Sequence, residues 1–348
     1  SDTAVAMAVD SSGSVYVTGF YASTNTVSLG NGLSLPVSLG IDVFTVKYDT
    51  SGTAQWYQTI RGTSSDIGFG IAVDSSGSVY VTGYYNSTTT VSLGNGLELP
   101  ASSGSDVFIV KYDTSGTAQW YQTMQVSTSD RGNGIVVDSS GSVYVTGYYA
   151  STNTVSLGNG LELPVSLGID VFTVKYDTSG TAQWYKTIPG TSVDRGNAIA
   201  VDSYGSVYVT GHYNSTTTVS LGNGLNLPVP SIYDVFIVKY DTSGTAQWFQ
   251  TIRGGSSDEA KAIAVDSSGS VYVTGFYEST TAVSLGNGLE LPVSLGYDAF
   301  IVKYSSNPIL FIDATTARVD VTGDAAISSN LAVGTNKLFV DTVGGTVG

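Results

Sequence analysis

A unit of 64 residues is repeated five times along this chain, and it limits the possible folds more than any other feature. Asp10, Asp74, Asp138, Asp202 and Asp266 are each separated by 64 residues, without insertion or deletion. Such a repeat is a supersecondary unit that stacks on its neighbours. We therefore interpret residues 1–304 as one domain of five copies: 1–64, 65–128, 129–192, 193–256 and 257–304.

Each copy predicts four short strands. In the second copy they span residues 70–74, 78–85, 106–113 and 117–124. The Asp-Ser-Ser-Gly and Asp-Thr-Ser-Gly connectors predict hairpin turns, because Asp accepts backbone N–H bonds and Gly takes a positive φ. Asn95-Gly96 predicts a further small hairpin between the second and third strands. Four antiparallel strands per copy, with no helical periodicity, predict an all-β fold: a β-propeller of five 64-residue blades.

Two segments of each copy resemble a known repeat family. They are Ile-Ala-Val-Asp-Ser-Ser-Gly-Ser-Val-Tyr-Val-Thr-Gly at 71–83 and Asp-Val-Phe-Ile-Val-Lys-Tyr-Asp-Thr-Ser-Gly-Thr-Ala-Gln-Trp at 106–120. Together they resemble the SBBP-type β-propeller repeat, over about residues 1–304. The family name implies seven blades, whereas five copies are present here, so the chain is either a five-bladed ring or a piece of something longer.

Residues 305–348 have a different sequence character. The fifth copy keeps three strands through Tyr304, and then Ser305-Ser-Asn-Pro replaces the expected turn. We expect Ile309–Asp313 to serve as the fourth strand of the last blade. Leu310-Phe-Ile-Asp recurs as Leu338-Phe-Val-Asp, and this β-rich tail resembles shaft and neck repeats of viral and phage fibres. That resemblance implies a homotrimer through the tail; a linker to another domain is the alternative.

Charge and composition exclude several classes of partner. The chain has 13 Lys and Arg against 28 Asp and Glu, a net charge of −15, which repels nucleic acid and anionic lipid. It contains no cysteine, so thiolate chemistry is excluded. No apolar run is long enough to cross a bilayer, and we expect no membrane insertion.

The copies differ mainly near the linkers between blades, at residues 66–70, 130–134, 194–198 and 258–262. These linkers and the long 86–106 segment lie at one face of a propeller, where we expect ligand-binding residues. A tyrosine that ends the second strand there is suited to stacking on a sugar ring, and core packing is the alternative. The candidates are Tyr21, Tyr85, Tyr149, Tyr213 and Tyr277, together with the sequon residues Asn86 and Asn214.

One aspartate per copy begins these linkers, and the five form a second candidate site. A ring of carboxylates could attract a hard cation such as Ca²⁺ as a cofactor. We favour the other interpretation, in which each aspartate caps its own linker turn. The five residues are Asp2, Asp66, Asp130, Asp194 and Asp258.

Catalytic residues are not expected. His212 aligns with Phe20, Tyr84, Tyr148 and Phe276, which indicates a substituted aromatic packing position. Glycosidases need two carboxyl groups, but we interpret the unrepeated Glu259 and Glu278 as surface substitutions. We expect Trp56 and the tryptophans at the same position of other copies to pack between blades. We expect Lys47 and the equivalent lysines to pair with turn aspartates.

These observations favour a non-enzymatic, multivalent adhesion or receptor-binding module of a virion fibre or other extracellular appendage. Five equivalent weak sites would gain avidity, and carbohydrate on a glycan or cell-surface receptor is the expected ligand. A structural spacer or capsid decoration that contacts neighbouring subunits is the alternative. A glycosidase-like propeller comes third. Either of the first two roles implies an extracellular or virion-surface location.

Overall fold

The computed structural model describes residues 2–125, 129–286, 288–305, 311–313 and 318–320. It divides into two compact units, Ser1–Ser305 and Ser306–Gly348. The described residues form strands and turns without a helix, so they contain no helix that could span a membrane.

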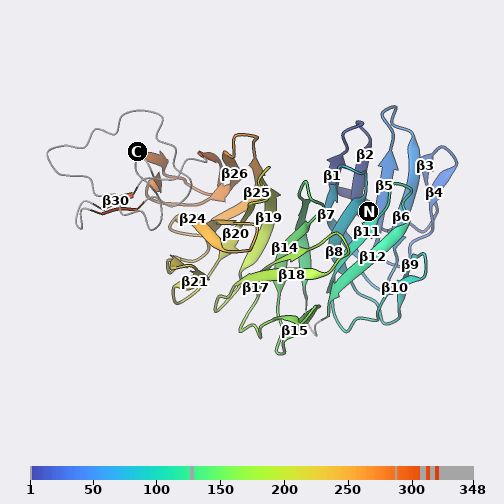
Figure 1. Ribbon diagram of the computed structural model, residues 1–348, viewed down its shortest axis with the longest axis horizontal. Coiled ribbons are helices and arrows are strands. Elements are labelled where there is room, and N and C mark those ends of the chain that lie inside the picture. Colours follow the sequence, from blue (N-terminus) through green and yellow to red (C-terminus); the bar gives the residue numbers. More distant parts are fainter. Residues whose placement is uncertain (1, 126–128, 287, 306–310, 314–317, 321–348) are drawn as a thin grey trace, which may run out of the picture. The chain divides into compact units, whose positions relative to one another are not determined.

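The first unit is a series of antiparallel sheets, one per sequence repeat, that confirms the predicted all-β propeller (Figure 1). Four sheets have four strands, in the order β1-β2-β5-β6 and its equivalents, and the fifth has three. The first strands are β1 (Thr3–Val9), β7 (Ile67–Val73), β13 (Arg131–Val137), β19 (Arg195–Val201) and β25 (Glu259–Val265). The second strands are β2 (Val15–Tyr21), β8 (Val79–Tyr85), β14 (Val143–Tyr149), β20 (Val207–Tyr213) and β26 (Val271–Tyr277).

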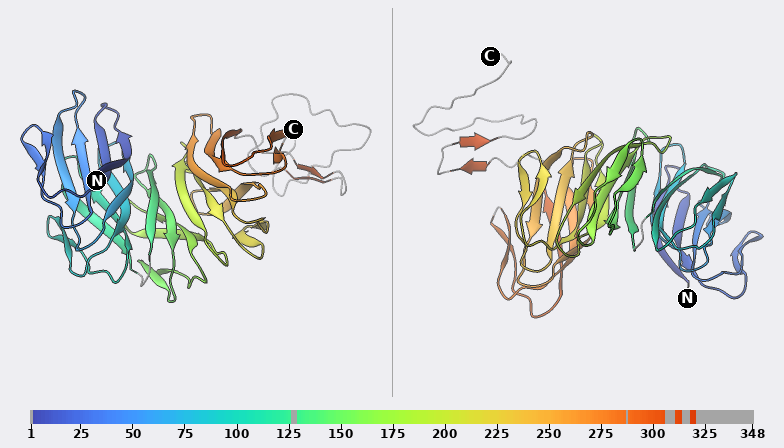
Figure 2. Two further views of the ribbon diagram at one scale, coloured as in Figure 1. Left: turned by 180° about the vertical axis from the view of Figure 1, so that it is seen from behind. Right: turned by 90° about the horizontal axis from the view of Figure 1, so that it is seen from below.

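The third strands are β5 (Asp42–Tyr48), β11 (Asp106–Tyr112), β17 (Asp170–Tyr176), β23 (Asp234–Tyr240) and β29 (Asp298–Tyr304). The fourth strands are β6 (Ala54–Ile60), β12 (Ala118–Met124), β18 (Ala182–Ile188) and β24 (Ala246–Ile252). In both views of Figure 2 the sheets follow one another in chain order through this unit. The first strand of each sheet contacts the first strand of the next, which places residues 64 positions apart side by side.

A small hairpin between the second and third strands of each copy confirms the expectation from Asn95-Gly96. Both residues have positive φ, 55° and 75°, as a tight two-residue turn requires. The side-chain amide of Asn95 also donates to the Ala118 carbonyl at 2.9 Å, which ties the hairpin to the fourth strand. The hairpins are β3 (Val27–Gly30) with β4 (Leu33–Leu35), β9 (Val91–Gly94) with β10 (Leu97–Leu99), β15 (Val155–Gly158) with β16 (Leu161–Leu163), β21 (Val219–Gly222) with β22 (Leu225–Leu227), and β27 (Val283–Gly286) with β28 (Leu289–Leu291).

The hydrophobic core lies between consecutive sheets rather than inside one. One buried cluster, for example, joins Tyr80 and Val107 of the second sheet to Val145 and Phe172 of the third. The tryptophans pack between blades, as the sequence predicted. Trp120 Nε1, for example, donates to the Thr178 carbonyl of the next blade at 3.1 Å. Each blade therefore needs its neighbours to bury its apolar faces.

Lys47 and its equivalents lie over tyrosine rings, with Nζ 5.1 to 5.3 Å from the ring centroids of Tyr16 and its equivalents. Pairing with a turn aspartate is confirmed at Lys239, whose Nζ lies 3.8 Å from Asp202 Oδ2. Both contacts keep a cation at the sheet surface while its aliphatic stem packs on the ring.

The last blade has three strands among the described residues. The strand β30 (Phe311–Asp313) pairs with β31 (Arg318–Asp320), and both belong to the second unit. The expectation that Ile309–Asp313 serves as the fourth strand of the last blade stays a prediction, and residues 309 and 310 lie outside the described residues. The Asp-Thr-Ser-Gly turn, which folds the third strand back in the other copies, is missing after Tyr304. The predicted fibre-like and trimeric character of the tail also falls mainly outside the described residues.

The two end faces of the series expose apolar side chains that are buried in the internal blades. Met7 of β1 is 68% exposed, whereas its equivalent Ile71 is 8% exposed. Ile301 of β29 is 75% exposed, whereas its equivalent Ile109 is fully buried. Within the described residues of the first unit, the first and last sheets therefore each have one exposed apolar face.

Candidate functional site

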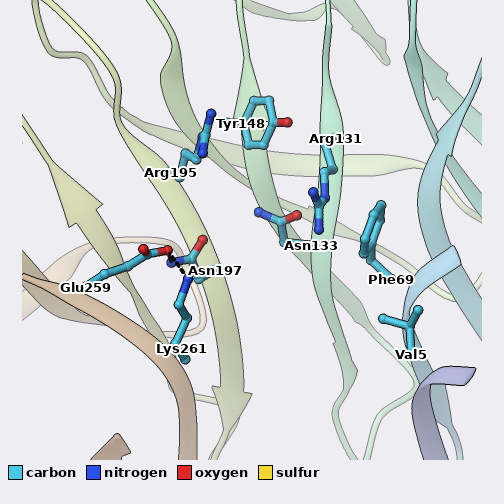
Figure 3. Close-up of a pocket in the computed structure, with 9 residues that line it drawn as sticks. All are labelled: Val5, Phe69, Arg131, Asn133, Tyr148, Arg195, Asn197, Glu259 and Lys261. Carbon is cyan, nitrogen blue, oxygen red and sulfur yellow. Dashed lines mark hydrogen bonds and ion pairs between the residues drawn. The ribbon is translucent and has the colours of Figure 1, made fainter. Parts of the chain in front are cut away.

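The side chains that depart from the repeat meet in one cavity along the first strands. They occupy two alternate positions of each strand, such as Arg131 and Asn133 of β13 or Arg195 and Asn197 of β19. The cavity measures about 300 Å³, and we call it the first-strand pocket (Figure 3). It is lined by Val5, Phe69, Arg131, Asn133, Tyr148, Arg195, Asn197, Glu259 and Lys261.

A β-bulge in each first strand directs one of these residues. In β13 the register with β14 shifts between Gly132 and Gly134, so Asn133 is the extra residue of the bulge. Bulges commonly re-aim a side chain in this way. The flanking glycine allows close packing, because a Cβ on Gly132 would lie 2.1 Å from Thr82 Oγ1 of the preceding blade. Local sequence thus brings the first strands close together and turns their variable residues toward one cavity.

Two asparagines connect successive first strands across the pocket. Asn133 Nδ2 donates to the Gly196 carbonyl at 2.8 Å, and Asn197 Nδ2 donates to the Ala260 carbonyl at 2.8 Å. With the amide oriented by this bond, Asn133 Oδ1 is buried without a hydrogen-bond partner. An unsatisfied acceptor of this kind is costly in a folded protein and marks a position where a ligand hydroxyl could donate.

Two arginines supply the cationic side of the pocket. Arg131 Cζ lies 3.3 Å from the centroid of the Phe69 ring, and Arg195 Cζ lies 5.0 Å from that of Tyr148. The Nε atoms of both arginines are buried without a partner. Burial is the main cause that lowers the pKa of Arg131, and the nearby charge of Arg195 adds to it. Guanidinium groups nevertheless stay charged in proteins.

Glu259 is the carboxylate of the pocket, and its expected role as a surface substitution is wrong. Its Oε1 accepts from Asn197 Nδ2 at 2.8 Å and lies 2.6 Å from Lys261 Nζ. Burial acts to raise its pKa, but His212 and Lys261 outweigh burial and lower the pKa to about 2. Glu259 is therefore ionised, and Lys261 lies with it in Figure 3.

His212 packs as the sequence indicates. Its side chain is buried and meets the Tyr233 ring edge-on, with the centroids 5.4 Å apart. Its Nδ1 lies 3.5 Å from Glu259 Oε1, so it also supports the carboxylate from behind the pocket.

The candidate sugar-stacking tyrosines are core residues, so the stacking prediction is wrong and the core-packing interpretation is confirmed. Tyr21, Tyr85, Tyr149, Tyr213 and Tyr277 are between 0% and 2% exposed. The hydroxyl of Tyr149, for example, donates to the Pro164 carbonyl at 3.0 Å. The small hairpin and the proline after it cover the end of the second strand, so no ring face remains for a ligand.

Asn86 and Asn214 directly follow two of these tyrosines and are half-buried. Their main-chain N–H groups donate to Asp66 and Asp194. A ligand-binding or glycosylation role for their side chains stays a prediction.

The five aspartates are separate turn caps, which confirms the favoured interpretation, and they do not form the candidate cation ring. Asp130 Oδ1 accepts from the Ala150 N–H at 2.8 Å, and Asp66 accepts from the N–H groups of Asn86 and Gly62. Among the described residues no group of three or more potential metal ligands forms. Asp2, at the exposed end, accepts from the Ala22 N–H at 3.0 Å. The other capping aspartates are Asp194 and Asp258.

Burial perturbs the proton affinity of these caps. It raises the pKa of Asp66 to about 7 and that of Asp258 to about 6. It also raises the pKa of Asp130 and of Asp194 to about 8. Each cap has an aspartate that begins a third strand nearby, and the charge of Asp106 contributes to the shift at Asp130. The carboxyl groups of Asp130 and Asp194 therefore hold a proton at neutral pH, whereas Asp66 is about half protonated and Asp258 is mostly ionised.

A second hollow of about 410 Å³ lies at the loops between the second and third blades, on the face favoured by the sequence. Its lining is polar, with Ser102, Asn153 and Thr154 among the contributors. Gln125 lines this hollow. The residues at the same position of the first and fourth copies, Arg61 and Arg253, pair with buried aspartates. The shorter glutamine leaves room there, but this hollow has no aromatic lining residue.

The sequence pattern did not predict the residues of the first-strand pocket as ligand contacts. It indicated a first strand that starts at Gly70, whereas β7 starts at Ile67. The residues that differ between copies therefore fell in the predicted linkers. The available signal was the spacing of two residues between the substituted positions, 131 and 133 or 195 and 197. That spacing is typical of one face of a strand.

Comparison with known proteins agrees with the blades described above. The profile of the SBBP family, described as a β-propeller repeat, matches residues 55–88 and 125–148. The chain carries SBBP-type β-propeller repeats. These matches cover parts of the first three copies and include all of β7, β8 and β13.

Two curated proteins are similar to the SBBP-repeat chain. An uncharacterised WD repeat-containing protein, L264, of Acanthamoeba polyphaga mimivirus is 25% identical over 372 residues, covering 87% of this chain and 27% of that protein. The regulatory protein FlaEY of Caulobacter vibrioides is 30% identical over 145 residues, covering 41% of this chain and 15% of that protein. The chain thus spans about a quarter or less of these relatives.

Among solved structures, a glucose dehydrogenase aligns over 79% of this chain and 80% of its own. The TM-score is 0.36 and the identity 11%.

Proposed function

We propose that this protein is a non-enzymatic binding module of a virion fibre or another extracellular appendage, and that its ligand is carbohydrate. The observation that carries the proposal is the first-strand pocket, where a regular scaffold concentrates its non-repeated side chains. Repeated positions maintain the blades, whereas the substituted positions differ in charge and shape from strand to strand. This division is typical of a rigid scaffold that presents a binding site.

The lining of the pocket suits a polyhydroxylated ligand. Asn133 Oδ1 offers an acceptor, the arginines offer donors, and the Tyr148 and Phe69 rings provide flat apolar contact. Sugars combine hydroxyl groups with an apolar ring face, so they match this mixture. With the repeated tyrosines buried, the site is asymmetric, and multivalency would come from several copies of the chain on one appendage.

The same residues support binding rather than glycoside hydrolysis. Glycosidases use a pair of carboxyl groups, one of which keeps a raised pKa to act as the acid. The lining contributes one carboxylate, Glu259, with a pKa lowered to about 2 and with Lys261 as its partner. Glu259 in that state neither donates a proton nor has a partner carboxylate in the pocket.

The test is binding of the labelled 1–348 protein to a broad glycan array, beside Asn133→Ala and a control. Tyr204→Ser is the control, because Tyr204 is 83% exposed on a tight turn and lies outside the pocket lining. We expect saturable binding to a related group of sugars, kept by Tyr204→Ser and weakened about 5- to 10-fold by Asn133→Ala. A blank array with folded protein would refute the proposal.

A structural role is the second candidate, and the exposed end faces favour it. Met7 on the first face and Ile301 on the last are apolar and largely exposed. Contact of these faces with neighbouring subunits would bury them as they are buried between internal blades.

A further inference from the structure

The first-strand pocket carries a local charge opposite to that of the whole protein. Its lining has three cations, Arg131, Arg195 and Lys261, and one anion, Glu259, so it sums to 3 − 1 = +2. The whole chain has a net charge of −15. A positive concave site in an acidic protein attracts and retains anions that the remaining surface repels.

The partners of the arginines distinguish this site from an ordinary ion-pair network. Arg61 Nε lies 3.3 Å from Asp42 Oδ2, and Arg253 Nε lies 2.9 Å from Asp234 Oδ2. In the part of the chain that the structure describes, no ion pair involves Arg131 or Arg195. In a chain with more than twice as many acidic as basic groups, two arginines that share a cavity and form no ion pair are unexpected.

The Glu259 carboxylate does not neutralise the two arginines, because other side chains already interact with it. Lys261, Asn197 and His212 surround Glu259 Oε1 at 2.6, 2.8 and 3.5 Å. The arginines instead rest against aromatic rings: Phe69 under Arg131, and Tyr148 beside Arg195 (Figure 3). Ring contacts fix a guanidinium in place and leave its planar fork able to bind an oxyanion in bidentate geometry.

We propose that Arg131 and Arg195 together bind the carboxylate of an acidic sugar, while Asn133 and the aromatic rings contact the sugar itself. This inference rests on the proposed carbohydrate-binding function and specifies its ligand class. The carboxylate supplies the counterion that the two guanidinium groups lack among the described residues. The sugar hydroxyls supply the donor that Asn133 Oδ1 lacks. A free oxyanion would satisfy the arginines but would leave the amide acceptor unpaired.

The test uses matched sugars measured by calorimetry or by ligand-observed NMR on the 1–348 protein. Methyl β-D-glucuronide and methyl β-D-glucoside differ in one group, a carboxylate against a hydroxymethyl. A methyl α-sialoside adds a second acidic sugar, and sodium acetate and sodium sulfate serve as simple anions. We expect at least one acidic sugar to bind about tenfold or more tightly than the glucoside, with an affinity that falls as salt rises.

Variants then assign the preference to the two arginines. Arg131→Gln and Arg195→Gln are each expected to weaken acidic-sugar binding about 10- to 100-fold, and so to reduce or remove the preference for the acidic sugar over the glucoside. Arg195→Lys keeps the charge but loses the fork, so it is expected to bind at an intermediate level. Arg253→Gln is the matched control, because the equivalent position of the second copy is naturally Gln125. It should keep the full preference.

The outcomes separate this inference from the proposed function. Equal binding of the acidic and neutral sugars, or a preference that survives both Gln variants, overturns the inference while carbohydrate binding stands. Acetate or sulfate binding as tight as the glucuronide or the sialoside shows an anion site without sugar recognition, and also overturns it. Binding of none of the sugars, here and on the array, overturns both. Arg195→Lys keeps the test decisive if a glutamine variant fails to fold.

Discussion

Replacement of Asp130 by asparagine tests whether buried turn caps set the pH dependence of stability. Asp130 Oδ1 accepts the Ala150 N–H at 2.8 Å, while Oδ2 is buried without a hydrogen-bond partner. Burial raises the pKa of the folded-state carboxyl from 3.8 to about 8. The folded protein therefore binds this proton more tightly than the unfolded chain. The stability that it contributes is complete below pH 3.8 and is lost as the pH rises toward 8.

The size of the effect follows from these two pKa values. Each pH unit between them is worth about 1.4 kcal/mol, so the interval from pH 5 to pH 8 corresponds to at most about 4 kcal/mol for one site. Asparagine keeps the acceptor for Ala150 and removes the titration. We expect Asp130→Asn to match the native protein within about 1 kcal/mol at pH 5, and to be more stable by about 2 to 4 kcal/mol at pH 8.

The assay is urea unfolding at pH 5 and pH 8, followed by the fluorescence of the four tryptophans. Asp177→Asn is the control, because hydrogen bonds from Ser179 and Thr181 lower the pKa of Asp177 and keep it ionised at both values. That variant should lose similar stability at pH 5 and pH 8. The reasoning fails if Asp130→Asn keeps the full native pH dependence, or if the native protein is no less stable at pH 8 than at pH 5.

Two further predictions concern packing. Tyr149→Phe loses the hydrogen bond to the Pro164 carbonyl and should cost about 1 kcal/mol of unfolding free energy without altering glycan binding; loss of binding by a folded variant would restore the tyrosine as a ligand contact. Gly132→Val places a branched side chain where even a Cβ lies 2.1 Å from Thr82 Oγ1, and should cost about 3 kcal/mol or more in chemical denaturation. Gly132→Ala should cost much less, since Ala260 fills the same position in the fifth copy, and equal losses for both variants would contradict this account.

The blade was predictable because its signals are local. The Asp-x-x-Gly turns, the Asn95-Gly96 hairpin and the alternating apolar residues each specify structure within a few residues. The packing of Trp120 was also predictable, since a large ring on a fourth strand has a neighbouring blade to contact. No local signal of this kind places a fourth strand in the last blade, because its closing turn is absent after Tyr304.

The sequence by itself determined the blades, their order and their turns, since each depends on contacts within about 64 residues of chain. The tertiary structure decided which side chains are available to a ligand. The hairpin of the same blade covers the Tyr149 ring. Hydrophobic periodicity does not show whether the end of a strand is exposed to solvent or covered in this way. Arg131 and Arg195 share a pocket because successive first strands lie side by side and their bulges turn inward. The site is therefore a property of stacked blades, and no single copy contains it.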